Sequence, residues 1–261
     1  FRSPHIKGKK ITQVEVYLDR LIKHPTPEQF VKNLTGRTIE EVSRRGKYLV
    51  LQTGADQKLI VHLRMTGSLV AQASELEAPP YAKIKFVLSG GVTMWFCDIR
   101  TFGTLYLVTN EDCYIAGYET LGPEPLTAGF SPDYLAPIAA KSRKPIKTLI
   151  LDQTVIAGLG NIYADEICFA LGLDPRSRAC KLSKKDCEKI VLETRRILQG
   201  ATHYGGTTIR SYTSSLGVTG RFQLHLKVHG QTQCKVCHHT IKKLTVSQRG
   251  TYLCPKCQKR K

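Results

Sequence analysis

Two pairs of cysteines near the end of the chain have the spacing of a metal site. Cys234 and Cys237 form one Cys-x-x-Cys pair, and Cys254 and Cys257 form a second pair after sixteen intervening residues. Each pair can offer two thiolates from one tight turn, and four thiolates complete the tetrahedral shell of a structural zinc ion. The alternatives are reduced thiols in a loop or two disulfides. The regular spacing favours one structural Zn2+, with no open position for a catalytic water.

Positive charge is concentrated around and before these cysteines. The formal net charge of the chain is +18, and its pI is near 9.6. The last carboxylate belongs to Glu193, and residues 194–261 contain thirteen Lys or Arg. A segment of this length without a carboxylate repels itself unless an anion offsets its charge. We therefore expect the last quarter of the chain to face nucleic-acid phosphates.

A glycine-rich turn before Asn161 offers a second phosphate site. Gly158 and Gly160 permit a tight bend with exposed amides, and a helix is predicted to begin at Asn161. The free N–H groups and the positive dipole end of a helix N-terminus favour phosphate. The other interpretation is a plain turn between two helices with an asparagine cap. The surrounding positive charge favours contact with a DNA backbone.

The remaining composition indicates a reducing compartment. No run is apolar enough to span a bilayer, and the first residues lack the apolar core of a signal peptide. The chain has nine cysteines, an odd number, and those outside the two pairs are scattered. Such thiols suit a reducing cytosol or nucleoid, where they serve as small core residues.

Residues 1–118 have the pattern of a β domain. The stretch from Ile11 to Leu18 alternates apolar and polar residues, as a half-buried strand does. A short helix is predicted over 27–34, with Thr26 as its N-cap. Further strands are predicted at 38–43, 47–52, 58–65, 83–89, 92–97 and 104–109. Short strands at this close spacing predict a β-sandwich or flattened barrel.

The composition and periodicity of the sequence change after this β domain. Residues 119–131 are rich in Gly and Pro and are predicted to form a linker. Helices are predicted from 131 or 132, over 145–152 and 161–171, and from Ser183 to about residue 201, where Ser183 and Asp186 form a capping box. A Ser/Thr-rich loop at 207–220 ends this helical domain (132–220), and a zinc module occupies 221–261. The predicted fold class is therefore α+β, with several domains.

The segment Gly158-Leu-Gly-Asn-Ile-Tyr-Ala-Asp-Glu166 resembles the helix-two-turn-helix signature of the formamidopyrimidine-DNA glycosylase family. Other matches follow the family's order along the whole chain: Arg44-Arg-Gly-Lys-Tyr-Leu49, His62-Leu-Arg-Met65, Asp98-Ile-Arg-Thr-Phe-Gly103, Leu121-Gly-Pro-Glu-Pro125, Ile146-Lys147 and Arg249-Gly-Thr-Tyr-Leu-Cys254. The resemblance implies a bacterial DNA-repair enzyme. It would remove oxidised purines, such as 8-oxoguanine or formamidopyrimidines, and cut the abasic strand by β,δ-elimination.

The resemblance also implies the setting in which the chain works. The partner would be double-stranded DNA with an oxidised purine or an abasic site, and no membrane. The protein would be a monomer in the bacterial cytoplasm, associated with the nucleoid. The endonuclease-VIII-like branch shares the architecture and prefers oxidised pyrimidines. Phe102 after Arg100 and the long loop at 207–220 favour the purine branch.

The resemblance assigns roles in the β domain. Lys47 matches a lysine that donates a proton in β-elimination; the alternative is a solvated lysine at a sheet edge. Met65, Arg100 and Phe102 match the three residues that fill the hole left by a flipped base. The alternatives are core packing for Met65 and Phe102, and a salt bridge with Asp98 for Arg100.

Further roles lie in the basic second half. Arg143, Lys147 and Asn161 match contacts to phosphates and the lesion strand, and Arg249 matches an arginine that grips phosphates and is assigned to δ-elimination. Without catalysis, these basic residues would still bind phosphate. The loop around Thr207 matches the lesion-capping loop, whose backbone amides hold the oxidised base; the residues concerned are Ile209, Arg210, Ser211 and Tyr212. The alternative is a plain connector.

The sequence departs from the family pattern at two places. The family's chains begin with Pro-Glu, whose proline amine is the nucleophile, whereas this sequence begins Phe1-Arg2-Ser3-Pro4-His5. The nitrogen of Pro4 is an amide, so we expect a sequence truncated at its start. The alternative function is a catalytically impaired protein that binds lesion or abasic DNA. Tyr81 and Lys83 stand where the family usually has a His-containing DNA contact. A third hypothesis, a zinc-ribbon factor unrelated to repair, leaves Lys47 unexplained.

Overall fold

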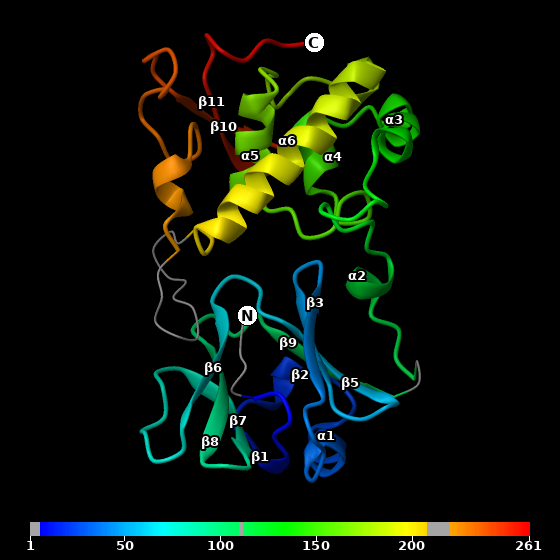
Figure 1. Cartoon of the computed structure of the whole chain (residues 1–261), viewed down its shortest axis with the longest axis vertical. Helices are drawn as coiled ribbons and strands as arrows, with labels where there is room; N and C mark the ends of the chain where they lie inside the picture. Colours follow the sequence, from blue (N-terminus) through cyan, green and yellow to red (C-terminus); the bar gives the residue numbers. More distant parts are fainter. Residues whose placement is uncertain (1–5, 110–111, 208–219) are drawn as a thin grey trace. The chain divides into compact units, whose positions relative to one another are not determined.

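The computed structural model describes residues 6–109, 112–207 and 220–261, which divide into two compact units (Figure 1). Unit 1 covers the described residues up to 116, and unit 2 covers those from 117 onward. The helical segments and the zinc module therefore belong to one unit. The predicted lesion-capping residues Ile209, Arg210, Ser211 and Tyr212 lie outside the described residues. Within the described ranges, no helix has the length and apolarity needed to cross a membrane.

Unit 1 is built from two sheets. One sheet is antiparallel and has the order β1 (Ile11–Val16), β7 (Ala82–Leu88), β8 (Val92–Asp98) and β6 (Gly67–Ala73). The other has the order β2 (Ile22–His24), β9 (Thr104–Thr109), β5 (Gln57–His62), β4 (Tyr48–Gln52) and β3 (Glu41–Arg45), with β2 and β9 parallel. A short 3-10 helix, η1 (Asp19–Leu21), precedes β2.

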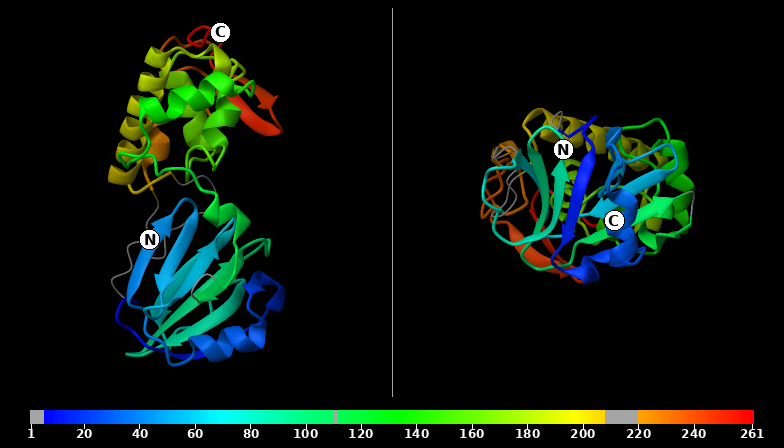
Figure 2. Two further views of the ribbon diagram at one scale, coloured as in Figure 1. Left: turned by 90° about the vertical axis from the view of Figure 1, so that its right-hand side faces the viewer. Right: turned by 90° about the horizontal axis from the view of Figure 1, so that it is seen from below.

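One apolar core joins these two sheets into a sandwich. Phe86 and Phe96 come from the first sheet and Leu59 from the second, and all are buried in one cluster. Helix α1 (Pro27–Leu34) covers one end of the sandwich (Figure 2) and places Phe30 edge-on against Phe86. Its predicted cap is confirmed, because the Thr26 hydroxyl accepts from the backbone N–H of Gln29. The predicted β-sandwich is therefore confirmed.

Several details of the strand prediction are wrong. Strand β5 ends at His62, because the chain turns over 63–66 and re-enters the other sheet as β6, a strand that was not predicted. Strand β3 begins at Glu41, because residues 38 and 39 pair with residues before β1 instead. Strand β4 begins at Tyr48, so Lys47 lies in the β3–β4 turn and not in a strand.

Unit 2 packs its helices around a second apolar core. It contains α3 (Pro132–Lys141), α4 (Ile146–Leu151), α5 (Asn161–Ala170) and α6 (Lys184–His203), after α2 (Ala116–Glu119) at the boundary. The 3-10 helices η2 (Ala179–Lys181) and η3 (Phe222–His225) complete it. Helix α6 crosses α5 (Figure 1), and its predicted Ser183–Asp186 capping box is present.

A β-hairpin of β10 (Lys242–Val246) and β11 (Arg249–Leu253) follows, and β11 contacts α5. Ser247 and Gln248 form its two-residue bend, both with positive φ (45° and 63°), as a type I′ turn requires. The register pairs Val246 with Arg249 across this bend. Arg249 is therefore the first residue after the bend, and its side chain is exposed.

Candidate functional site

Two loops of unit 1 bring Met65, Arg100 and Phe102 together. The loops connect β5 to β6 and β8 to β9. A guanidinium nitrogen (Nη1) of Arg100 lies 3.3 Å from the Met65 sulfur, and its Cζ lies 4.7 Å from the centroid of the Phe102 ring. Met65 is 70% exposed and Phe102 is 54% exposed, so core packing does not account for either residue. The three side chains form an exposed apolar and cationic cluster.

The buried carboxylate of Asp98 organises this cluster from below. Asp98, at the end of β8, is 1% exposed. One oxygen accepts from the Thr66 hydroxyl at 2.5 Å and from the backbone N–H of Arg100 at 3.2 Å, and the other accepts from the backbone N–H of Gly103 at 2.8 Å. Asp98 therefore holds the backbone of Arg100 and links the Met65 loop to the Phe102 loop.

Close backbone approaches constrain both loops as well. A Cβ on Gly67 would meet the Leu63 carbonyl oxygen at 2.3 Å, because this glycine closes the turn that carries Met65. The non-glycine residues Arg64, Tyr81 and Thr101 adopt positive φ angles of 56°, 62° and 54°. Such backbone conformations are unfavourable for these residues and gather at functional sites. The shape of this surface is therefore imposed by the fold.

Lys47 lies beside a small aromatic cluster. The rings of Tyr48 and His62 meet edge to face with centroids 4.6 Å apart, and the Nδ1 of His62 accepts from the backbone N–H of Arg64 at 2.9 Å. Burial, followed by the charges of Arg64 and Lys47, lowers the pKa of His62 to about 4. His62 is therefore neutral at physiological pH, with its hydrogen on Nε2. Lys47 itself is exposed.

Tyr81 and Lys83 lie beside the end of β8, where the Arg100 loop begins. Tyr81 is 56% exposed, and its carbonyl accepts from the backbone N–H of Asp98 at 3.1 Å. Lys83, on β7, is partly exposed. Burial raises the pKa of the Cys97 thiol to about 11, and the charge of Lys83 opposes that rise. A backbone hydrogen bond thus joins Tyr81 to Asp98, the residue from which the Arg100 loop begins.

The four predicted zinc ligands converge. The sulfur atoms of Cys234, Cys237, Cys254 and Cys257 all lie within 4.8 Å of one another. The Cys234–Cys257 sulfurs are 3.8 Å apart and the Cys237–Cys254 sulfurs 3.4 Å. A tetrahedron with Zn–S bonds of about 2.3 Å has edges of about 3.8 Å, so the residues fit a zinc ion.

These thiols differ in how readily each ionises when no metal ion compensates them. A hydrogen bond with the His239 backbone is the main cause that lowers the pKa of Cys237 to about 7. Burial and the neighbouring sulfurs raise the pKa of Cys257 to about 12. Four crowded thiols ionise together only when a cation compensates their charge. All four positions of the ion would be taken by sulfur, so its contribution is structural.

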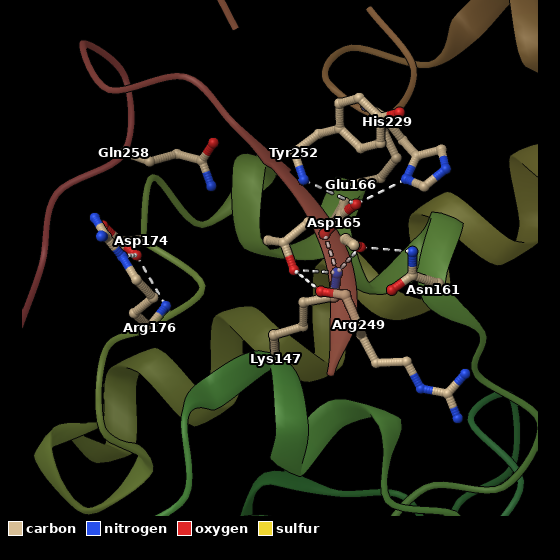
Figure 3. Close-up of polar contacts among 12 residues, drawn as sticks. Lys147, Asn161, Asp165, Glu166, Asp174, Arg176, His229, Arg249, Tyr252 and Gln258 are labelled. Carbon is tan, nitrogen blue, oxygen red and sulfur yellow. Dashed lines mark hydrogen bonds and ion pairs between the residues drawn. The ribbon is translucent and has the colours of Figure 1, made fainter. Parts of the chain in front are cut away.

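Lys147 is not where the sequence places it. It was predicted to contact phosphate, but its side chain is 0% exposed. Its ammonium lies 2.7 Å from a carboxylate oxygen (Oδ1) of Asp165, and donates to the Gly250 carbonyl at 2.9 Å and the Thr251 hydroxyl at 2.8 Å (Figure 3). A direct phosphate contact needs an accessible ammonium, so the structure contradicts that prediction. Lys147 instead ties α4 to β11.

The other predicted phosphate contacts of unit 2 are accessible. Arg143 and Arg249 are exposed. In Figure 3 the guanidinium of Arg249 extends away from the polar network around Lys147. Asn161, partly exposed at the start of α5, donates its side-chain amide to the Gly250 carbonyl at 2.9 Å. The N-cap of this helix is Gly160, which has no side chain to accept a hydrogen bond, so the first N–H groups of α5 lack a side-chain cap.

Sequence reasoning missed the acids that organise both units. Besides Asp98, these are Asp165 and Glu166 on α5. Glu166 accepts from three successive backbone N–H groups, of Lys227, Val228 and His229, at 2.8–2.9 Å. The signal was present: two adjacent acids interrupt an otherwise apolar helix, and buried charges require partners.

Comparison with known protein families matches three stretches of the chain. Residues 1–105 match the Formamidopyrimidine-DNA glycosylase N-terminal domain, and 121–213 match the Formamidopyrimidine-DNA glycosylase H2TH domain. Residues 233–260 match the zinc finger found in FPG and IleRS. The matches span the β-sandwich, the helices and the cysteine hairpin in order.

Individual relatives agree over nearly the whole chain. The formamidopyrimidine-DNA glycosylase of Streptococcus mutans is 42% identical, covering 97% of this chain and 93% of that protein. The one of Geobacillus kaustophilus is 40% identical, covering 98% and 94%. A Lactococcus lactis enzyme solved with Fapy-dG-containing DNA has a TM-score of 0.91 at 34% identity, and one solved with abasic-site DNA has 0.90 at 35%; both cover 98% of this chain and 94% of theirs. The chain therefore belongs to the formamidopyrimidine-DNA glycosylase family.

Proposed function

We propose that this protein acts on duplex DNA that contains an oxidised purine or an abasic site, removing the base and cutting the strand by β,δ-elimination. The observation that carries the proposal is the exposed cluster of Met65, Arg100 and Phe102 on two constrained loops. The solved Lactococcus lactis relatives are complexes with Fapy-dG-containing and abasic-site DNA, which supports this substrate class.

The cluster suits a DNA duplex from which one base has been flipped. Flipping leaves a hole in the base stack, and unstacking costs a few kcal/mol. Met65 and Phe102 can fill the hole with apolar surface, while the guanidinium of Arg100 donates to the orphaned partner base. The stacking of Arg100 on Phe102 and its contact with Met65 already hold these groups as one wedge.

Lys47 is proposed to serve the elimination steps. Its exposed ammonium can donate a proton to the opening sugar or the leaving group. The neighbouring His62 stays neutral, so it adds no positive charge that would repel the Lys47 ammonium, and it offers an Nε2–H donor. Tyr81 and Lys83 supply further contacts to the backbone of the same strand.

Unit 2 is proposed to grip the phosphates. Asn161 at the start of α5, Arg143 before α4 and Arg249 after the hairpin bend supply neutral and cationic donors. Arg249 is further proposed to assist δ-elimination. The zinc ion would hold the two knuckles that flank the hairpin and take no part in a chemical step. The loop from Ile209 to Tyr212 is proposed to cap the base with backbone amides, as the family resemblance implies. A nucleoid-associated monomer fits this role.

Borohydride trapping tests the proposal. A proline amine that attacks the sugar carbon displaces the base and, once the sugar ring opens, forms an iminium ion, which borohydride reduces to a stable protein–DNA adduct. The chain is incubated with an 8-oxoguanine:cytosine duplex, both as printed and preceded by the family's Pro-Glu start. We expect an adduct and β,δ-elimination products from the extended chain. If the extended chain forms no adduct yet binds the lesion duplex tightly, the proposed glycosylase and lyase activities are wrong. The alternative function, binding to lesion DNA without catalysis, is then supported.

A further inference from the structure

A buried carboxylate on α5 connects the interior of unit 2 with the start of β11. The side chains of Asp165 and Lys147 are both 0% exposed, and their charged atoms lie 2.7 Å apart. The second oxygen of Asp165 (Oδ2) lies 2.7 Å from the Nδ1 of His229 and accepts from the backbone N–H of Tyr252 at 3.3 Å. One carboxylate thus contacts three separate segments of the chain (Figure 3).

The contacts reach each of the three residues that follow Arg249. The Lys147 ammonium donates to the Gly250 carbonyl at 2.9 Å and to the Thr251 hydroxyl at 2.8 Å. The backbone N–H of Tyr252 donates to Asp165. The Thr251 hydroxyl in turn donates to the Arg249 carbonyl at 2.9 Å. The backbone next to Arg249 is therefore held by hydrogen bonds to buried side chains of α4 and α5.

The buried ion pair of Lys147 and Asp165 can position the backbone beside Arg249, but it cannot contact DNA itself. A buried ion pair contributes little net stability, because desolvation offsets its attraction, but it defines one geometry strongly when further hydrogen bonds satisfy it. Neither Lys147 nor Asp165 has an accessible atom for DNA. The two zinc knuckles hold the far ends of the hairpin, whereas Arg249 lies at its bend. Zinc alone therefore leaves the bend without an anchor.

We propose that Asp165, acting through Lys147, is a positioning residue for Arg249. It fixes the bend end of the hairpin on α5, next to Asn161, through contacts that do not include the zinc ligands. This inference rests on the proposed phosphate contact of Arg249. It gives Lys147 a role in DNA binding without any contact to DNA.

The salt dependence of DNA binding tests the proposal. Each phosphate contact contributes about 0.9 to the slope of log K against log [salt]. The affinity for a duplex with a tetrahydrofuran abasic analogue is measured for Asp165→Asn, Arg249→Ala and the double variant. We expect each single variant to lower the slope by about one contact, and the double variant to lower it no further. A change that merely unfolds part of the protein lowers the active fraction and leaves the slope unaltered.

Hydrogen exchange provides a second readout that needs no DNA. In Asp165→Asn with one zinc ion per chain, the Tyr252 amide should exchange at least about tenfold faster, because it loses a charged acceptor. The amide of Gln258, which donates to the Cys254 carbonyl in the zinc knuckle at 3.0 Å, should not change. Unchanged exchange at Tyr252 would overturn the proposal.

Two further variants separate positioning from folding. Asp165→Asn leaves the Lys147 ammonium without a counter-charge, so Lys147→Met/Asp165→Asn is made as a neutral pair, with the same loss of slope expected. The matched control is Asp152→Asn, which breaks the exposed 2.9 Å pair with Lys144 in the same unit; it should keep the wild-type slope. If Arg249→Ala alone leaves the slope unchanged, the proposed phosphate contact fails, and the exchange of Tyr252 alone decides the positioning.

Discussion

The side-chain amide of Asn161 donates to the carbonyl oxygen of Gly250 at 2.9 Å. This bond joins the first residue of α5 to the residue that follows Arg249. The helix N-terminus and the hairpin bend are thus fixed relative to each other inside unit 2. Two groups that were predicted independently to contact phosphate therefore form one donor surface with a single geometry.

Truncation of the Arg100 cluster should remove the preference for abasic DNA. Arg100→Ala or Phe102→Ala eliminates a group that would fill the vacated stack, worth about 1–3 kcal/mol per stacked group. We expect a loss of roughly 10- to 100-fold in affinity for a duplex with an abasic analogue, with affinity for intact duplex nearly unchanged. Fluorescence anisotropy with both duplexes measures the ratio. The control is Leu76→Ala, another exposed apolar residue of unit 1; an equal effect there would contradict the assignment.

Removal of the Asp98 carboxylate should loosen the same cluster from within. Asp98→Ala leaves the N–H groups of Arg100 and Gly103 and the Thr66 hydroxyl without their acceptor. Each orphaned donor costs about 1–3 kcal/mol when buried. We expect a lower midpoint for urea unfolding of unit 1, followed by Trp95, the only tryptophan, which lies buried on β8. Wild-type stability in this variant would show that the loop does not depend on Asp98.

A methyl group at Gly67 should disturb the Met65 turn. Its Cβ would lie 2.3 Å from the Leu63 carbonyl oxygen, and backbone cannot move aside cheaply. We expect Gly67→Ala to weaken abasic-duplex binding about as much as Met65→Ala does. Gly91→Ala, in the β7–β8 turn, serves as a control that strains the backbone through its φ of +67° but adds no steric contact, since a Cβ there meets nothing within 4 Å. Equal binding by Gly67→Ala and wild type would contradict the tight turn.

Zinc removal should abolish DNA binding and spare unit 1. The hairpin depends on four thiolates around one ion, and chelation leaves crowded thiols without a compensating charge. We expect a chelator to eliminate binding to an abasic duplex, while the Trp95 unfolding transition stays in place. Cys234→Ser should reproduce the loss, whereas Cys180→Ser, outside the cluster, should not. Chelated protein that binds at full affinity would disprove the structural role.

Acid should destabilise unit 1 through His62. Its pKa is about 4 in the folded protein and 6.5 in the reference state. Between these values the unfolded chain binds more protons than the folded one, so stability falls as pH drops from about 6.5 toward 4 and is unaffected by this group above that window. Thermal unfolding of wild type and His62→Gln at several pH values measures the difference. The variant should lose less stability than wild type over this window; parallel curves would contradict the buried, neutral histidine.

The sequence by itself determined those features whose chemistry is local. The zinc ligands come from two short turns, and the caps at Thr26 and Ser183 act over three residues. Each of these features depends on the spacing of residues along the chain, so it can be predicted without knowledge of the fold. The alternation of apolar residues likewise predicted most strands of the sandwich.

Only the tertiary structure decided which polar residues are buried and what they hold. Lys147 reads as one more basic residue, yet it meets Thr251, 104 positions away, and has no exposed side chain. Asp98 and Asp165 read as ordinary acids, yet Asp98 accepts from the Thr66 hydroxyl of a second loop, and Asp165 contacts side-chain or backbone groups of three other segments. Burial depends on which distant segments pack together, and a charge enters the interior only where those segments supply partners. That information is absent from the spacing of neighbouring residues.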